Sequence, residues 1–270
     1  MNFLDKILKF YIHSSLHVAF AVVAFVGVTY LDFGLKFDLW LMGFVFFSTI
    51  LAYTFVKHIH LIREKKFQWS LKLKLIFLLA ALSSVPITIS LFHFDAELIS
   101  IMVGLGIFTL LYILPFLPKA KNLRDVSGLK IFIIALVWSG ATVVLPLFSF
   151  ENAISWYEAN ILYYISSRFC FVIALIIPFE IRDLKLDDIY LKTLPQVLGV
   201  MKTKLLAIVL VLGSCFFLNS AQVESSAYMI IHVLMIILIL GSKKQKAFLY
   251  TAFVVESVPI LWFALKYFAF

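Results

Sequence analysis

The chain has 270 residues, of which 63% are hydrophobic and only 14% are charged. Soluble proteins are roughly 45–50% apolar and about 25% charged, so a water-soluble enzyme and a disordered chain are both excluded. The formal net charge of +8 would suit nucleic acid or a membrane, and membrane topology alone accounts for it, so we expect no nucleic-acid partner. Cys170 and Cys215 both lie in apolar runs, which predicts neither a disulfide framework nor a thiolate metal site.

Cutting the sequence at its charges leaves nine apolar stretches, each near the roughly 20 residues that a helix needs to cross a bilayer. An open sheet would leave backbone groups unpaired in lipid, and the stretches are too long for barrel strands. We therefore predict an all-α polytopic membrane protein that forms one transmembrane domain over residues 1–270. In chain order the expected spans are 10–31, 39–56, 75–94, 98–118, 131–150, 159–179, 205–223, 225–242 and 247–265.

The basic residues alternate between the two sides of these spans. All of them except Lys36, Arg168 and Lys266 lie at the N-terminus or after the second, fourth, sixth and eighth stretches. Because basic residues favour the cytoplasmic side, the N-terminus is expected in the cytoplasm and the C-terminus outside, as in a bacterial inner membrane. The long cytoplasmic loops 57–74, 119–130 and 180–204 are then expected to form the working surface.

The third of these loops carries the densest set of charges. If the sixth helix continues past the membrane, Glu180, Asp183 and Asp187 share one face at positions i, i+3 and i+7. Carboxylates in one stripe suit Mg²⁺, and the interleaved Arg182 can meet phosphate oxygens, as can Lys185 and Lys192. A solvated charged face held together by local ion pairs is the alternative interpretation.

The order of residues in this loop resembles the second aspartate motif of the UbiA-type intramembrane prenyltransferases. The matching stretch is Glu180-Ile-Arg-Asp183, then Asp187, then Thr193-Leu-Pro195 through Gly199. The family has nine transmembrane helices and long cytoplasmic loops after the second and sixth. A further similarity, between the fourth and fifth spans, consists of Tyr112, Lys119, Lys121, Arg124, Gly128 and Lys130.

The resemblance implies a helical bundle around a membrane-embedded cavity that opens to the cytoplasmic side. It also implies transfer of a polyprenyl group from its diphosphate to a small, aromatic or quinone-type acceptor. Asp183 and Asp187 would be the catalytic pair, and with Glu180 they would hold Mg²⁺. The expected diphosphate contacts are Lys57, Lys119, Lys121, Arg124 and Arg182. The expected partners are a polyprenyl diphosphate, or another isoprenoid lipid, and the bilayer itself.

The family's first aspartate motif is missing. Its place reads Tyr53-Thr-Phe-Val-Lys-His-Ile-His-Leu-Ile-Arg-Glu64, where Glu64 is the one acidic residue. Three explanations remain open: Lys57 and its basic neighbours replace a metal at the diphosphate, His58 and His60 bind a metal, or the fold has lost catalysis and binds an isoprenoid or a quinone. A small transporter is disfavoured because no internal repeat is recognisable.

Two charged residues lie midway along predicted spans, Arg168 in the sixth and Glu256 in the ninth. Because a charge at the bilayer centre is costly, such residues usually face the protein interior and pair. We therefore expect Arg168 and Glu256 to form an intramembrane ion pair. Small residues allow close helix packing, which predicts close contacts at Gly104, Gly106 and Gly140.

Overall fold

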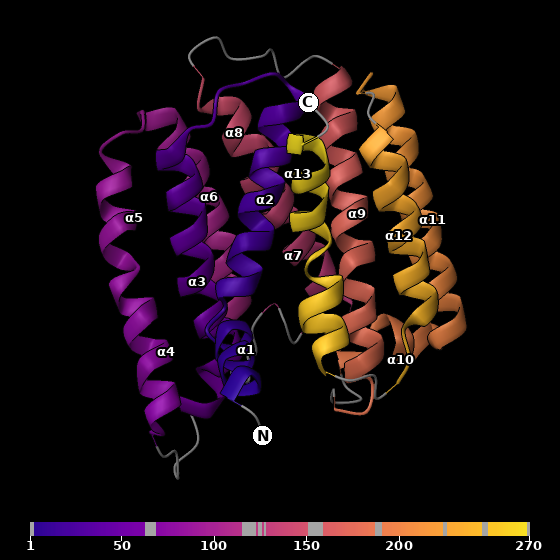
Figure 1. The fold of residues 1–270 in the computed structure, drawn as a ribbon, viewed down its shortest axis with the longest axis horizontal. Helices are drawn as coiled ribbons and strands as arrows, with labels where there is room; N and C mark the ends of the chain where they lie inside the picture. The colour runs from indigo at the N-terminus through magenta and orange to yellow at the C-terminus, as the bar shows by residue number, and fades with distance from the viewer. Residues whose placement is uncertain are drawn as a thin grey trace.

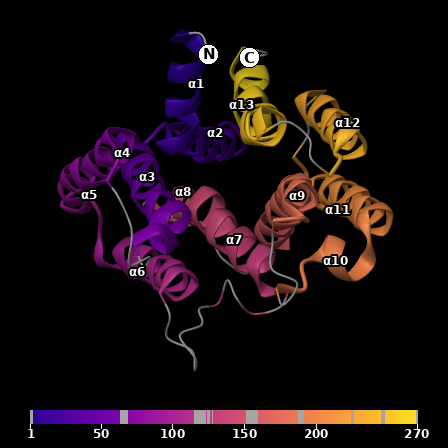
Figure 2. The ribbon, with the colours of Figure 1, turned by 90° about the horizontal axis from the view of Figure 1, so that it is seen from below.

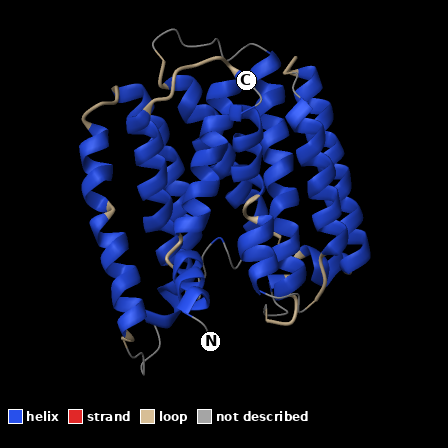
Figure 3. Ribbon diagram, in the orientation of Figure 1, coloured by secondary structure: helices blue, strands red, loops and turns tan. Residues whose placement is uncertain are grey.

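The structure, a computed structural model, describes residues 3–62, 69–114, 123, 126, 128–150, 159–186, 191–223, 226–244 and 248–268. Figure 3 shows helices joined by loops in these ranges, without a strand among the residues described. The helices are α1 (Phe3–His13), α2 (Leu16–Asp32), α3 (Leu39–Ile62), α4 (Leu71–Leu82), α5 (Ser84–Leu91), α6 (Ala96–Ile113), α7 (Leu129–Ser139), η3 (Gly140–Val144), α8 (Leu145–Phe148), α9 (Ala159–Asp183), α10 (Leu194–Leu198), α11 (Val200–Ser220), α12 (Ser226–Gly241), η5 (Tyr250–Val255) and α13 (Val258–Phe268). The all-α class is confirmed.

The long helices form a closed ring that is visible when the molecule is viewed along its helices (Figure 2). Going round the ring, α2 contacts α3, α3 contacts α6, and the contacts continue through α7, α9, α11, α12 and α13 back to α2. The α4 and α5 helices pack on the outer flank of α3. The segment α7–η3–α8 contacts both α2 and α9, and in all three segments most residues are buried.

The chain ends lie at opposite ends of the bundle. In Figure 1 the N-terminus, α1 and α10 lie at the lower end, and α8 and the C-terminus lie at the upper end. The predicted nine crossings, an odd number, require this arrangement. Which end faces the cytoplasm stays a prediction from the basic residues.

Seven helical segments in the described ranges are long and apolar enough to span a membrane, or up to eight if the bent pair α1–α2 counts as one span. The segment predicted as the eighth span, α12, is apolar but shorter than the others, with 16 residues. The polytopic membrane class is therefore supported, and the count of nine remains a prediction. Helices also run past the predicted spans, because hydropathy marks the apolar core of a helix and not its ends: α3 continues to Ile62, inside the segment expected as the loop 57–74.

Two spans contain a π-helical turn shortly before a proline. The η3 turn precedes Pro146, which has no N–H to donate to the Thr142 carbonyl one turn earlier. The Thr29 hydroxyl of α2 donates to that carbonyl at 2.6 Å. The η5 turn precedes Pro259 in the same way. Each proline therefore frees backbone groups that a neighbouring helix or a local side chain can satisfy.

Candidate functional site

An apolar cavity of about 530 Å³ lies in the half of the ring formed by α2, α3, α5, α6 and α7. Its polar lining residues are Ser48, Thr49, Tyr53, Thr109, Tyr112 and Trp138, and the other lining residues are apolar. Small-molecule sites typically measure about 300–1,000 Å³ and are mostly apolar with a few polar groups. A hydrocarbon chain is the ligand that this lining fits.

Tyr53 and Trp138 both line this cavity. The Trp138 Nε1 donates a hydrogen bond to the Tyr53 hydroxyl at 2.9 Å, which ties α7 to α3. Their ring centroids are 6.4 Å apart in an edge-to-face arrangement. One helical turn beyond Tyr53 towards the lower end, the Lys57 ammonium lies 5.7 Å from the centroid of the Tyr53 ring. The apolar cavity therefore borders a charged group.

Three charged side chains from different segments interact around Glu256, and we call them the polar centre: Lys57 of α3, Arg182 of α9 and Glu256, which lies between η5 and α13. Lys57 and Arg182 are the cations whose fields act on the Glu256 carboxylate. The Lys57 ammonium donates to the Ile12 carbonyl at 3.2 Å. All three side chains are only partly accessible. The sequence singled out each of these residues but did not predict that they meet.

Asp183 is bound by its own neighbour. The Arg182 guanidinium donates to both carboxylate oxygens of Asp183, at 2.6 and 2.7 Å, and its remaining nitrogen donates to the Thr251 hydroxyl of η5 at 2.5 Å. Helix α9 ends at Asp183, and the Leu186 N–H closes a turn onto the Asp183 carbonyl. The expected stripe along one continuous helix is therefore wrong. Asp187 lies outside the described residues.

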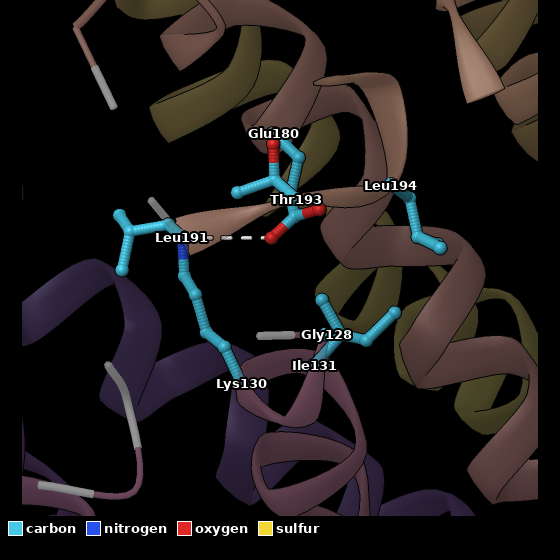
Figure 4. A pocket seen from close by; sticks show the side chains of 7 residues that line it. All are labelled: Gly128, Lys130, Ile131, Glu180, Leu191, Thr193 and Leu194. Carbon is cyan, nitrogen blue, oxygen red and sulfur yellow. Dashed lines mark ion pairs between the residues drawn. The ribbon is translucent and has the colours of Figure 1, made fainter. Parts of the chain in front are cut away.

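Glu180 lies on the opposite side of the end of α9 and faces α7. Its Oε1 is 3.6 Å from the Lys130 ammonium, and only 3% of the Glu180 side chain is exposed (Figure 4). Thr193 and Leu194, at the start of α10, close the same spot. Gly128, with φ at +71°, begins α7 there. Four of the residues that carry the family resemblance thus meet, namely Glu180, Thr193, Gly128 and Lys130, although the void between them is about 10 Å³, room for at most one water molecule.

The described carboxylates do not fit a Mg²⁺ site in this arrangement. Asp183 is occupied by Arg182, and Glu180 lies beside Lys130. In the part of the chain that the structure describes, no three side chains of the metal-binding types cluster. Among the predicted diphosphate contacts, Lys119, Lys121 and Arg124 also lie outside the described residues. No chemical step is therefore assigned to an ion here.

The expected pair of Arg168 and Glu256 does not form. Arg168 donates instead to the Phe25 carbonyl at 3.2 Å, to the Thr29 hydroxyl at 3.4 Å and to the Tyr164 hydroxyl at 3.0 Å. Its guanidinium carbon also lies 4.2 Å from the centroid of the Phe25 ring. The sequence placed both charges midway along predicted spans but did not predict which side chains lie opposite each of them. The prediction of this ion pair is wrong.

A buried polar network at the upper end was missed. The Asp32 carboxylate, with no exposed side-chain surface, pairs with the Lys266 ammonium and accepts hydrogen bonds from the Tyr164 hydroxyl at 2.5 Å and from the Tyr228 hydroxyl. Tyr164 in turn accepts from Arg168. Asp32 and Lys266 flank apolar runs in the sequence, and hydropathy alone does not distinguish such residues from charges in loops. The spacing of Tyr164 and Arg168 at i, i+4 was the one available signal.

Three solved structures resemble the whole chain. An apo UbiA homologue from Aeropyrum pernix K1 has a TM-score of 0.64 at 13% identity, covering 94% of this chain and 98% of its own. A UbiA homologue from Archaeoglobus fulgidus bound to GPP and Mg²⁺ has a TM-score of 0.63 at 13% identity, covering 96% and 98%. The chain has a UbiA-like fold. A structure described as a digeranylgeranylglyceryl phosphate synthase, at 12% identity, covers 97% of this chain and 99% of its own with a TM-score of 0.56.

No protein-family model matches the sequence, and no curated protein sequence matches it either. The UbiA-like fold therefore confirms the resemblance inferred from a motif of about twenty residues, and at this identity it confirms the fold alone. The residue roles implied by that resemblance stay predictions. They now have positions: Glu180 and Lys130 at one side of α9, and the polar centre at the other.

Proposed function

We propose that this protein is a divergent prenyltransferase that holds an isoprenoid diphosphate with its chain in the apolar cavity and its head at the polar centre. The observation that carries the proposal is the continuity between the two: Tyr53 lines the cavity, and Lys57 lies over the ring of Tyr53. An amphiphile fits this arrangement, because its hydrocarbon tail can lie in the apolar cavity and its anionic head can lie beside Lys57. The homologue from Archaeoglobus fulgidus binds GPP, a ligand of this class.

The chemistry follows from the residues at the junction. When the allylic C–O bond breaks, its electron pair leaves with the diphosphate, and fixed cations stabilise that leaving group. Lys57 and Arg182 are the basic side chains in place, which favours the explanation that basic residues replace part of the missing first motif. The faces of Tyr53 and Trp138 stabilise the allylic cation by roughly 0.5–2 kcal/mol each. A small acceptor, aromatic or quinone-type, then captures the cation.

Binding can be measured with geranyl diphosphate, geraniol and inorganic diphosphate on the protein purified in detergent, with and without Mg²⁺. We expect geranyl diphosphate to raise the unfolding temperature and to change tryptophan fluorescence, a change that Trp138→Phe removes. Mg²⁺ is part of the test because Asp183 and Asp187 are its predicted ligands. Indifference of the wild-type protein to geranyl diphosphate under both conditions contradicts the proposal.

Matched variants separate tail binding from head binding. Ala52→Phe places a ring in the cavity, whereas Ala81→Phe changes an exposed alanine of α4. We expect Ala52→Phe to lower the affinity for geranyl diphosphate at least tenfold, which corresponds to about 1.4 kcal/mol. Ala81→Phe should leave this affinity unchanged. Lys57→Met should lower the affinity for geranyl diphosphate but not the affinity for geraniol. Substitution of an exposed lysine, Lys74→Met, is the control. Equal behaviour within either pair counts against this placement of the ligand.

A non-catalytic isoprenoid- or quinone-binding protein is the second candidate. It is favoured because the charges beside the cavity compensate each other. Arg182 is hydrogen-bonded to Asp183, and the charge of Lys57 acts on Glu256. A balanced site suits a neutral head group. The two functions differ in turnover: release of diphosphate from geranyl diphosphate in the presence of a membrane-lipid extract supports the enzyme. Copurification of a quinone without such release supports the binder.

A further inference from the structure

Glu256 is placed by the π-helical turn that precedes it. Its backbone N–H donates to the Thr251 carbonyl five residues earlier at 3.2 Å, whereas a regular helix would use a four-residue step. Pro259 follows in the first turn of α13. The wider turn displaces Glu256 from the position that a regular helix would give it. π-Helical turns occur frequently at functional sites.

The Glu256 carboxylate lies deep in the bundle without a direct partner. Within the described ranges it makes neither a hydrogen bond nor an ion pair, and the interactions it has are the fields of Lys57 and Arg182. Part of the side chain is nevertheless accessible. The phenols of Tyr11 on α1 and Tyr53 on α3 lie within the reach of its charge. An ionisable residue inside the membrane is a functional-site candidate by default, and this one remains partly accessible.

The charges around Glu256 restrict what can bind there. A carboxylate or phosphate group placed directly against the Glu256 oxygens meets repulsion, so the diphosphate of the donor is expected against Lys57 and Arg182 instead, and a cationic group meets repulsion from those two cations. A neutral group that donates a hydrogen bond satisfies the carboxylate without either cost. Tyr53 places this position at the boundary between cavity and head group, where the allylic bond of a bound isoprenoid diphosphate would break.

We propose that Glu256 binds the hydroxyl group of a neutral phenol- or hydroquinone-type acceptor and so selects against acceptors that carry a carboxylate. This inference rests on the proposed function, which supplies the donor. In the transfer step the allylic carbon loses the diphosphate with the C–O bonding pair. The acceptor forms its new bond to that carbon with an electron pair of its own, and its hydroxyl proton passes to a Glu256 carboxylate oxygen.

The test compares two acceptors that differ by one carboxylate, naphthalene-1,4-diol and 1,4-dihydroxy-2-naphthoate, together with geranyl diphosphate as donor. We expect the wild-type protein to bind the diol at least tenfold more tightly than its carboxylate. Glu256→Gln keeps the shape of the side chain and removes its charge. This substitution should lower the affinity for the diol at least tenfold and reduce the difference in affinity between the two acceptors. It should raise the affinity for geranyl diphosphate.

Opposite changes for donor and acceptor separate this role from a structural one, because a misfolded site would weaken both. Glu256→Asp should recover part of the diol affinity, and the exposed Glu97→Gln at the start of α6 is the matched control. The inference is overturned if the wild-type protein binds the carboxylate acceptor more tightly than the diol. It is also overturned if Glu256→Gln binds neither the diol nor geranyl diphosphate. If the wild-type protein binds the diol through Glu256 but ignores geranyl diphosphate, the Glu256 site stands and the proposed function falls.

Discussion

The two halves of the bundle differ in how the space between their helices is filled. Around α9 the aromatic rings of Phe25, Phe171 and Trp262 meet edge to face, with centroids 4.9–6.0 Å apart. Of the residues in the apolar window of α9, 61% are buried, against 22% in α3 and in α6 and also 22% in α11, which packs on α9. The half that contains α3 and α6 contains the cavity of about 530 Å³ instead.

The bonds made by polar side chains contribute to this difference, although one interhelical bond, from Trp138 to Tyr53, also crosses the hollow half. In the packed half, Arg168 and Asp32 bond to other helices. In the hollow half, the hydroxyls of Thr88, Ser90 and Thr109 bond back to carbonyls of their own helices. Lipid supplies no hydrophobic drive between helices, so interhelical polar bonds and close contacts determine where the helices pack tightly. The hollow half is thereby left open for a ligand.

The largest effect is expected from breaking the network in the packed half. Asp32→Ala leaves the Lys266 ammonium buried without its carboxylate, which typically costs about 3–5 kcal/mol. The unfolding temperature in detergent should fall sharply. Adding Lys266→Met should restore much of the loss, because both charges are then gone. Asp32→Ala with wild-type stability would show that the network does not hold the packed half together.

Glycine substitutions test the contrast directly. A Cβ at Gly27 of α2 would lie 2.5 Å from the Phe263 ring of α13, so Gly27→Ala should cost about 1–3 kcal/mol through overpacking. A Cβ at Gly106 of α6, which lines the cavity, meets nothing within 4 Å. Gly106→Ala should stabilise the protein by up to about 1 kcal/mol, because alanine favours a helix. Thermal unfolding shows whether each variant is more or less stable than the wild-type protein. Stability changes of the same sign would contradict the difference between the packed and the hollow half.

The same glycines show what the sequence can predict. Close packing at Gly140 is confirmed, since a Cβ there would lie 2.5 Å from the Leu105 side chain. At Gly104 and Gly106 it is wrong, because those positions face open space. A small residue permits a close contact but does not create one. Whether the contact forms depends on which helices lie opposite, and a single sequence does not contain that order.

The charged residues divide in a similar way. The resemblance motif predicted that the segments around Glu180 and around Gly128 and Lys130 belong to one site, and they meet. Hydropathy placed Arg168 and Glu256 midway along predicted spans but did not predict which side chains lie opposite them, so the predicted pair was wrong. No residue pattern predicted the π-helical turn before Glu256. Span positions were therefore predictable, whereas the partners of buried charges were not.

The smallest expected effect concerns the hydrogen bond that crosses the hollow half. Tyr53→Phe removes the acceptor of the Trp138 indole N–H and should cost about 0.5–1.5 kcal/mol. The Trp138 emission should also shift, because its indole loses its hydrogen-bond partner at the cavity wall. Tyr267→Phe, at an exposed tyrosine of α13, is the control. If the two variants have the same stability and emission, the bond between α3 and α7 contributes nothing, and the shape of the cavity is set by apolar packing alone.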